Sequence, residues 1–372
     1  MKILILGVNG FIGCNLTSAI LRDTDWEVYG MDMAADKLGT AVNHPRFHFL
    51  EGDLTINKEW VSYHIKKCDV CLPLVAIATP ATYVQDPLRV FHLDFEENLA
   101  VVRQCAVHHT RVLFPSTSEV YGMCEDESFD PENSNLVYGP IHKERWIYAC
   151  AKQLLDRVIF AMGKHEQLRF TLFRPFNWVG PGLDSIHSEK EGSSRVVTQF
   201  LGHLLRGENI QLVDGGQQRR CFTAIGDGID ALMRIIANRD GCADGRIFNL
   251  GNPNNDLSVR ELALTLKEIA SGYPEVAAAV ARCQLQDVTA TAYYGVGYQD
   301  MSKRKPDISG TTAALDWTPQ VDTAQMLQST VAYSINEFLS RERSVYDYHL
   351  RIAAADSAAA SVSVAPESCA SR

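Results

Sequence analysis

The chain has 372 residues, of which 46% are hydrophobic and 22% are charged. This length allows two domains, or one large α/β domain with a second lobe, and the composition excludes a largely disordered or collagen-like chain. The 35 basic and 45 acidic residues give a formal net charge of −10, so no overall positive field attracts nucleic acid or an anionic membrane. An anionic ligand must therefore be held by a local group of cations.

Cysteine usage and hydropathy indicate the compartment. The cysteines are spread along the chain without the dense spacing of a secreted disulfide framework, which favours a reducing environment. Cys68 and Cys71 form a C-x-x-C pair at the start of an apolar run, without a second pair nearby, so we expect core positions and no metal site. No apolar stretch approaches the ~18 residues of a membrane helix. We therefore expect a cytoplasmic protein with no membrane or nucleic-acid partner.

Short apolar runs alternate with amphipathic stretches through the first half of the chain. Strands are predicted at Ile3–Leu6, Val28–Met31, Phe47–Leu50, Val70–Leu74, Val112–Phe114 and Phe170–Phe173, and helices at Phe11–Leu21, Phe95–His108 and Trp146–Met162. Repeated βαβ units predict an α/β fold with a doubly wound parallel sheet of the Rossmann type.

The pattern changes in the second half. From about Asn177 it loosens into loops rich in Gly and Pro, with helices predicted near Ser194–Arg206, Gly226–Ala237 and Ser258–Ile269. We assign residues 1–176 to the domain built on this sheet and 177–340 mainly to a smaller second lobe that is partly interleaved with it. Residues 353–372 are mostly Ala and Ser and are expected to form a disordered tail, because they cannot bury enough apolar surface.

A glycine-rich turn, Gly7-Val8-Asn9-Gly10-Phe11-Ile12-Gly13, joins the first predicted strand to the first helix. Glycines let the backbone approach a pyrophosphate, whose charge faces the N–H groups of the helix N-terminus. Asp32 ends the second strand, where a carboxylate accepts from ribose hydroxyls and repels a 2′-phosphate, so NAD is favoured over NADP. Asp53 and Leu54 are expected beside the adenine, with an ordinary turn residue as the alternative for Asp53.

Tyr148 and Lys152 are four residues apart and lie on one face of a predicted helix. An ammonium and a positive nicotinamide stabilise phenolate, so Tyr148 can take a hydroxyl proton while hydride leaves the same carbon for NAD. Such a pair alone is common on helix surfaces, but the glycine-rich turn gives it a functional interpretation. The segment Ser116 to Gly122 directly follows the fifth strand, at the edge where such sheets bind ligands.

Together these motifs resemble the extended short-chain dehydrogenase/reductase family that acts on nucleotide sugars. From residue 2 to about 338 the chain is similar to its UDP-glucuronate oxidative decarboxylases of the ArnA type, through segments at 75–80, 133–137, 143–148, 174–178, 214–223 and 298–306. The resemblance implies that NAD oxidises the sugar C4 hydroxyl and that the resulting β-keto acid loses C6 as carbon dioxide, giving a UDP-4-keto-pentose.

The resemblance also assigns residues. Tyr148 is the expected oxidation base and Lys152 its partner, while Glu119 and Arg304 serve the decarboxylation and the return of a proton. A guanidinium at Arg304 can bind the carboxylate and stabilise the enolate, although a surface position in the run Lys303-Arg304-Lys305 is the alternative. The expected substrate contacts are Ala78, Tyr83, Thr117, Ser118, Arg145, Asn177, Gln211, Arg220 and Tyr298; Ala78 can also be simple core packing.

Single residues of this chain distinguish it from relatives with other activities. Sugar 4,6-dehydratases carry an acid where Ser118 stands, and apiose/xylose synthases carry cysteines where Ala78 and Ser118 stand, so both are disfavoured. A UDP-xylose synthase that reduces the ketone again and a UDP-glucuronate 4-epimerase stay open. A non-catalytic dinucleotide sensor is disfavoured because Tyr148 and Lys152 are both present.

The chain starts at the first strand, so the formyltransferase domain of bifunctional relatives is not expected. Relatives generally pair through two helices, which makes a homodimer the expectation.

Overall fold

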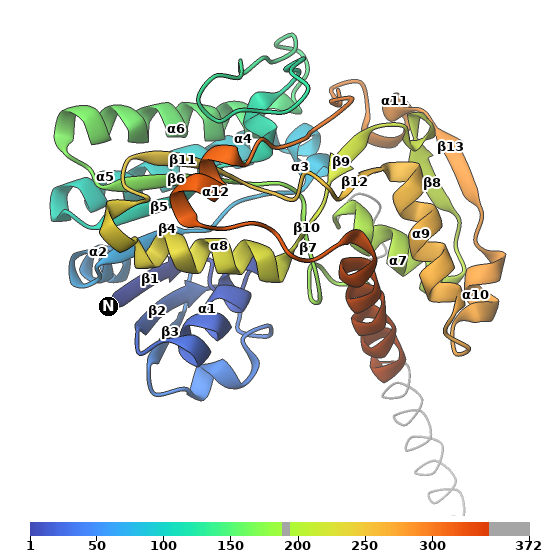
Figure 1. Cartoon of the computed structure of the whole chain (residues 1–372), viewed down its shortest axis with the longest axis horizontal. Helices are drawn as coiled ribbons and strands as arrows, with labels where there is room; N and C mark the ends of the chain where they lie inside the picture. The colour runs from blue at the N-terminus through green and yellow to red at the C-terminus, as the bar shows by residue number, and fades with distance from the viewer. Residues whose placement is uncertain (188–193, 342–372) are drawn as a thin grey trace, which may run out of the picture.

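A parallel sheet with helices on both faces forms the larger part of the molecule. The computed structural model describes residues 1–187 and 194–341, so the predicted tail at 353–372 lies outside the described residues. The sheet has seven strands in the order β11-β6-β5-β4-β1-β2-β3 (Figure 1). The strands are β1 (Lys2–Leu6), β2 (Glu27–Asp32), β3 (Phe47–Glu51), β4 (Val70–Pro73), β5 (Arg111–Pro115), β6 (Phe170–Pro175) and β11 (Arg246–Leu250). The six predicted strands are confirmed, and β11 is an addition to them.

The strand residues alternate between two apolar layers. Ile3 and Ile5 contact one buried cluster, whereas Leu4 and Leu6 contact the other. The first layer includes α1 (Phe11–Asp23) and α8 (Ile225–Ala237), and the second includes α2 (Lys58–Lys67), α5 (Asn98–His108) and α6 (Trp146–Glu166). Because both faces are covered, the strands are apolar throughout their length. Cys68 and Cys71 are buried in the second layer, as expected for core positions.

The order of the strands creates a crevice. β1 lies between β2 and β4, so the chain winds away in opposite directions from this point. In open parallel sheets the crevice at the carboxyl ends beside such a switch point is where ligands bind. The segments that follow β1, β4, β5 and β6 meet there, and each carries predicted site residues.

A second lobe lies beside the carboxyl ends of the strands (Figure 1). It contains α7 (Val196–Arg206), α9 (Val259–Ser271), α10 (Ala277–Arg282) and α11 (Ala290–Tyr294), with the paired strands β8 (Ile210–Val213) and β13 (Leu285–Val288), and β9 (Arg219–Cys221) and β12 (Asp256–Ser258). The pair β7 (Trp178–Val179) and β10 (Thr223–Ala224) joins it to the sheet, and a helix spans 323–341. Since α8, β11 and α12 (Ser309–Leu315) return to the sheet layers, the two parts interleave; the boundary at residue 176 stays a prediction.

One predicted helix differs in its first turns. Instead of a single helix from Phe95, the chain forms α3 (Pro80–Gln85), α4 (Pro87–Phe91), a π-helical turn η2 (His92–Glu97) and then α5. Short 3-10 turns occur at η1 (Gly39–Asn43), η3 (Ser118–Tyr121), η4 (Asp214–Gly216) and η5 (Arg239–Gly241). The π turn widens the helix locally, and such turns are frequent at functional sites.

The described residues contain neither a membrane-spanning helix nor a metal-binding cluster of side chains. Within 1–187 and 194–341, no helix is both long enough and apolar enough to cross a membrane. Over the same ranges, no group of three or more His, Cys, Asp or Glu side chains is placed to hold a metal ion.

Candidate active site

A cavity of about 530 Å³ lies at the carboxyl ends of the strands and extends under the second lobe. Most of the predicted site residues line it: Gly7, Gly10, Phe11, Ile12, Gly13, Ala78, Tyr83, Thr117, Ser118, Glu119, Arg145, Tyr148, Lys152, Asn177, Gln211, Arg220, Tyr298 and Arg304. Asn9, Asp32, Asp53 and Leu54 are not among the lining residues. Residues from Gly7 to Arg304 are thus brought to one cavity because the crossovers return each strand end to the same edge of the sheet.

The glycine-rich turn forms a close-fitting backbone cradle at one end of the cavity. A Cβ atom added at Gly13 would lie 2.5 Å from the Gly7 carbonyl oxygen, so no side chain is tolerated there. Gly7 itself has a φ of 84°, in the left-handed region that glycine enters without strain. Helix α1 has no side-chain cap at Gly10 and no acidic residue in its first turn, so its N-terminal N–H groups are available to an anion.

Asp32 lies against this turn. Its carboxylate accepts hydrogen bonds from the backbone N–H groups of Asn9 and Met33, each 2.8 Å long. Burial raises the pKa of Asp32, although these N–H groups oppose the shift. The Asn9 side chain donates to Asp36 at 2.7 Å and accepts from the Lys37 N–H at 2.8 Å, which ties the turn to the segment after β2. Asn9 therefore shapes the cradle from outside the cavity.

Asp53 and Leu54 occupy a local turn after β3. The Asp53 carboxylate accepts from the N–H and the hydroxyl of Thr55, at 2.7 and 2.8 Å, and Leu54 is buried. This geometry is that of a strand-end turn residue, which was the alternative interpretation of Asp53. Its contact with an adenine stays a prediction.

Tyr148 and Lys152 project from α6 into the middle of the cavity. The Tyr148 ring stacks on Tyr83, with ring centroids 4.6 Å apart and planes 6° from parallel. Burial, followed by the charges of Asp94 and Glu119, raises the pKa of Tyr148, whereas a hydrogen bond with Thr117 lowers it. The Lys152 ammonium is 5.9 Å from the centre of the Tyr148 ring and is almost completely buried. The pair expected from the sequence is therefore assembled, with Tyr83 fixing the plane of the phenol.

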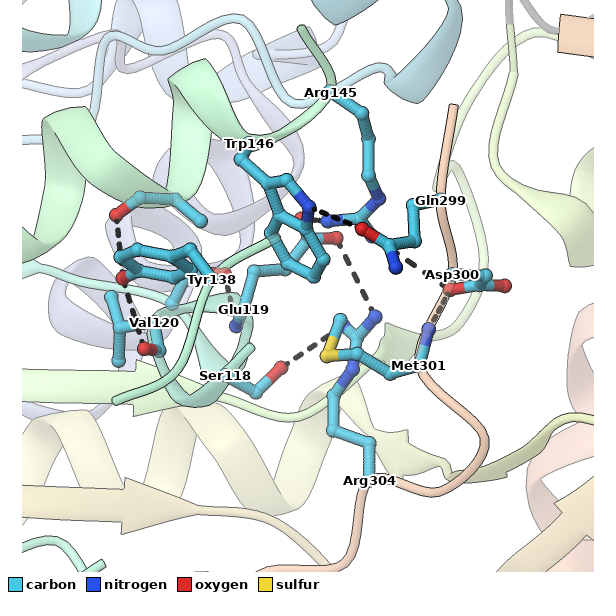
Figure 2. A network of polar contacts seen from close by, with 12 residues as sticks. Ser118, Glu119, Val120, Tyr138, Arg145, Trp146, Gln299, Asp300, Met301 and Arg304 are labelled. Carbon is cyan, nitrogen blue, oxygen red and sulfur yellow. Dashed lines mark hydrogen bonds and ion pairs between the residues drawn. The ribbon is translucent and has the colours of Figure 1, made fainter. Parts of the chain in front are cut away.

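A cluster of buried charges lines the same cavity as Tyr148, and Figure 2 shows four of its members, Glu119, Arg145, Asp300 and Arg304. Glu119, in the turn η3 that follows β5, forms an ion pair with Arg145 at 3.0 Å and another with Arg304 at 3.5 Å. Asp300 lies 2.6 Å from Arg220 and 3.8 Å from Arg145. These three guanidinium groups face only two carboxylates within the cluster, so one positive charge is left without a partner there.

Arg304 is the least compensated member of this cluster. Its guanidinium donates to the Ser118 hydroxyl at 3.2 Å, and its side chain is only 7% exposed. Burial and the nearby charge of Arg220 lower its pKa to about 10, although Glu119 opposes the shift. The Nε atom of Arg304 is buried and has no hydrogen-bond partner among the described residues. Of the run Lys303-Arg304-Lys305, only the arginine is buried, which rules out the surface position that the sequence left open.

The segment that carries Arg304 is held by main-chain hydrogen bonds on both sides. Arg219 N–H donates to the Ser302 carbonyl at 2.9 Å, and Phe129 N–H donates to the Lys305 carbonyl at 2.8 Å. The Asp307 N–H returns to the Phe129 carbonyl at 2.9 Å. Residues 302–307 thus lie between β9 and the loop around residue 129, and this placement aims Arg304 at Ser118.

The remaining predicted substrate residues line the far part of the cavity. Gln211 lies on β8, and Asn177, directly after β6, donates from its side chain to the Cys221 carbonyl at 2.8 Å. Tyr298 stacks on Tyr294 with ring centroids 3.9 Å apart, and Arg145 lies 5.6 Å from the Tyr298 ring. Ala78 lines the cavity in the segment after β4.

Two residues were missed by the sequence analysis. Asp300 is a lining residue that joins Arg145 to Arg220, and Asp94 is a buried carboxylate 3.5 Å from the Lys152 ammonium. Asp300 lies in the segment 298–306 that carries the resemblance, but no role was assigned to it, and Asp94 lies in none of the motifs. Only contacts with residues far away in the sequence distinguish them from ordinary exposed acids.

The amino-acid sequence matches the model of a known protein family. The model described as the NAD dependent epimerase/dehydratase family matches residues 3–251, which is more than half of the chain. The chain belongs to this family. The match covers the glycine-rich turn, the Tyr148/Lys152 helix and the strand-end serines, and it stops before Asp300 and Arg304.

Solved structures extend the likeness over the second lobe. The PbgP3 protein from Burkholderia pseudomallei is 60% identical, with a TM-score of 0.82, over 89% of this chain and 95% of that one. A UDP-glucuronic acid 4-epimerase from Bacillus cereus, in complex with UDP-glucuronic acid and NAD, is 19% identical with a TM-score of 0.74 over 90% and 99% of the two chains. A UDP-glucose 4-epimerase from Thermotoga maritima is 22% identical with a TM-score of 0.73 over 91% and 100%. These last two share the fold.

Members of this family use NAD, and the residues of this chain fit it. The backbone at Gly13 has no room for a side chain, and the N–H groups at the N-terminus of α1 would hold the pyrophosphate of the dinucleotide. Asp32 lies beside the turn as an acceptor for ribose hydroxyls. Further into the cavity, the Lys152 ammonium is buried without a standard hydrogen bond among the described residues, so it can donate to a bound ribose.

Proposed function

We propose that the chain catalyses the NAD-dependent oxidative decarboxylation of UDP-glucuronate, releasing carbon dioxide and a UDP-4-keto-pentose. The observation that carries this proposal is the position of Arg304. Its buried guanidinium contacts Ser118 and Glu119 in the same cavity as Tyr148. The cluster around it has one positive charge more than its carboxylates balance, which favours binding of an anion.

The charge balance favours an acidic sugar over a neutral one. Arg145, Arg220 and Arg304 are each at least nine-tenths buried, and only Glu119 and Asp300 oppose them within the cluster. An unpaired buried charge is costly, so a ligand that brings a carboxylate gains more here than in water. A planar guanidinium also matches a carboxylate in geometry.

The first chemical step requires a base at the C4 hydroxyl. Tyr148 accepts this proton as phenolate, and Thr117, which hydrogen-bonds the phenol, stabilises that form. Lys152 supplies a positive charge close to the phenol ring. When bound, NAD accepts the hydride that leaves C4. Tyr83 keeps the phenol in one plane, so that its oxygen stays directed at the substrate.

The second step breaks the bond between C5 and C6. A ketone at C4 makes the acid a β-keto acid, so the electron pair of this bond can move toward the C4 oxygen as carbon dioxide leaves. Arg304 binds the carboxylate before this step and stabilises the enolate that forms. We assign the return of a proton to C5 to Glu119, whose carboxylate lies between Arg145 and Arg304.

The test is direct. Purified protein is incubated with NAD and UDP-glucuronate, and carbon dioxide, NADH absorbance and the mass of the sugar product are measured. Loss of carbon dioxide together with two hydrogens is the expected result. Loss of carbon dioxide with those hydrogens retained would identify a UDP-xylose synthase, and an unchanged sugar mass would refute decarboxylation and leave epimerisation or no reaction.

The assembly and the location belong to the same proposal. We propose a homodimer in the cytoplasm, on the likeness of the chain to its relatives and on its cysteine usage. Light scattering coupled to gel filtration measures the mass of the assembly. A monomer at micromolar concentration would contradict the dimer without bearing on the chemistry.

A further inference from the structure

Lys152 has a buried partner that the mechanism above does not use. Its ammonium lies 3.5 Å from the Oδ1 atom of Asp94, and the two side chains are 1% and 0% exposed. Neither atom has a hydrogen bond of standard geometry among the described residues. The contact is therefore mainly electrostatic, in a region where water does not screen it.

The π turn η2 supplies this carboxylate. Asp94 lies in the turn, and its other oxygen accepts a hydrogen bond from the Ile77 N–H at 3.0 Å. Asn98, at the start of α5, donates to the Leu93 carbonyl at 2.9 Å and to the Val75 carbonyl at 3.1 Å, which satisfies a backbone group inside the widened turn. The carboxylate is thus fixed by the segment after β4, the same segment that lines the cavity with Ala78.

Few other charges face Lys152. From its own helix, Asp156 is the second acid, but that carboxylate is already bound by Arg174 at 3.2 Å and by the Ser116 hydroxyl at 2.7 Å. From β5, Lys152 meets the Phe114 ring at 4.9 Å, which is uncharged. Tyr148, one turn earlier on α6, completes the surroundings. Asp94 is therefore the acid that compensates the ammonium most directly.

The electrostatic balance gives the pair a role. Burial lowers the pKa of Lys152, and the charge of Asp94 opposes this shift. Burial likewise raises the pKa of Asp94, and Lys152 opposes that. A lysine that lost its proton could neither stabilise a phenolate nor donate its full set of hydrogen bonds to a ribose.

We propose that Asp94 is a positioning residue that keeps Lys152 charged and directed toward Tyr148. The inference rests on the proposed roles of Tyr148 and Lys152, and not on the identity of the sugar or on decarboxylation. Glu97 provides the matched control. It belongs to the same π turn and is also buried, but its carboxylate pairs with Lys58 at 3.2 Å and has no contact with Lys152.

The first experiment needs no turnover. Protein labelled with carbon-13 at the lysine ε carbon is titrated by NMR, and the Lys152 signal is assigned by its loss in Lys152→Arg. Asp94→Asn is expected to lower the midpoint of the Lys152 titration by about one pH unit or more, whereas Glu97→Gln leaves it in place. An unchanged midpoint in Asp94→Asn would overturn the proposal. If that variant does not fold, a wild-type Lys152 that is neutral near pH 7 overturns it equally.

The second experiment follows catalysis. Single-turnover NADH formation is measured across pH, which reports oxidation at C4 whether or not carbon dioxide follows. Asp94→Asn is expected to move the alkaline limb, where Lys152 loses its proton, to lower pH by about one unit, whereas Glu97→Gln leaves this limb in place. An equal loss at every pH, or an unchanged alkaline limb with only the acid limb moved to lower pH, would show that Asp94 is only structural or only opposes the phenolate. Absence of carbon dioxide from the wild type would refute the proposed function and leave this comparison intact.

Discussion

Replacing Arg304 by alanine separates the two chemical steps. The variant should bind NAD and the nucleotide sugar and should still oxidise C4, because the glycine-rich turn, Tyr148 and Lys152 are untouched. Glu119 keeps its 3.0 Å pair with Arg145, so no carboxylate is left unpaired in the cluster. Decarboxylation should slow, because the Arg304 guanidinium no longer stabilises the charge that develops as carbon dioxide leaves.

The size of the effect follows from burial. Arg304 is 7% exposed, so solvent screens its charge only weakly. Two unit charges about 4 Å apart at an effective dielectric constant of about 20 interact by about 4 kcal/mol, and removal of one preorganised donor from an anion site costs about 10²–10³ in rate. We therefore expect release of carbon dioxide to slow by about two to three orders of magnitude.

The assay measures both steps in one reaction. Carbon dioxide is followed from substrate labelled at C6, and NADH absorbance reports oxidation during a single turnover. Lys303→Ala, one position away and only half-buried, is the control for local disturbance. Carbon dioxide release at the wild-type rate from Arg304→Ala would refute the reasoning, as would an equal loss of both steps.

Three further predictions concern the cofactor, the base and the core. Gly13→Ala should abolish NAD binding in calorimetry while the chain stays folded, because its Cβ would lie 2.5 Å from the Gly7 carbonyl oxygen; retained affinity would contradict the cradle. Burial and neighbouring carboxylates raise the pKa of Tyr148, and only the phenolate accepts a proton, so kcat/KM for oxidation should rise with pH above neutrality; a rate that falls with pH would exclude this base. Asp156→Asn should lower the free energy of unfolding by about 3 kcal/mol or more in urea, since it breaks a buried ion pair, while Asp230→Asn, in an exposed pair, should change it by less than about 1 kcal/mol. Equal effects of these two variants would show that burial does not set the cost.

The sheet was predictable because its strands are buried on both faces. Ile3 to Leu6 and its counterparts read as continuous apolar runs, a pattern that depends only on local sequence. β11 escaped detection because the polar Arg246 and Asn249 interrupt its apolar run. In the fold, the Asn249 amide donates to the carbonyls of Phe129 and Asp307, at 2.7 and 3.1 Å. Both partners are distant in sequence, so the residues around Asn249 do not indicate these hydrogen bonds.

The cofactor turn and the Tyr148/Lys152 pair were also visible in the sequence, because each is a local motif with a fixed spacing. The two acids of the site were not. Asp94 stands just before the predicted helix at Phe95–His108, and in the structure it is buried within the π turn η2. Asp300 belongs to the site because it pairs with Arg145 and Arg220, which come from distant segments of the chain. Long-range ion pairs leave no periodic signal in the chain.

The clamp around residues 302–307 has a consequence for the evolution of new chemistry. Since main-chain groups hold this segment on both sides, its path depends little on which side chain stands at position 304. A lineage, or an engineer, can therefore exchange the group that meets the sugar acid without dismantling the architecture around it. On the same fold, the residue at position 304 would then determine which reaction follows oxidation of the sugar.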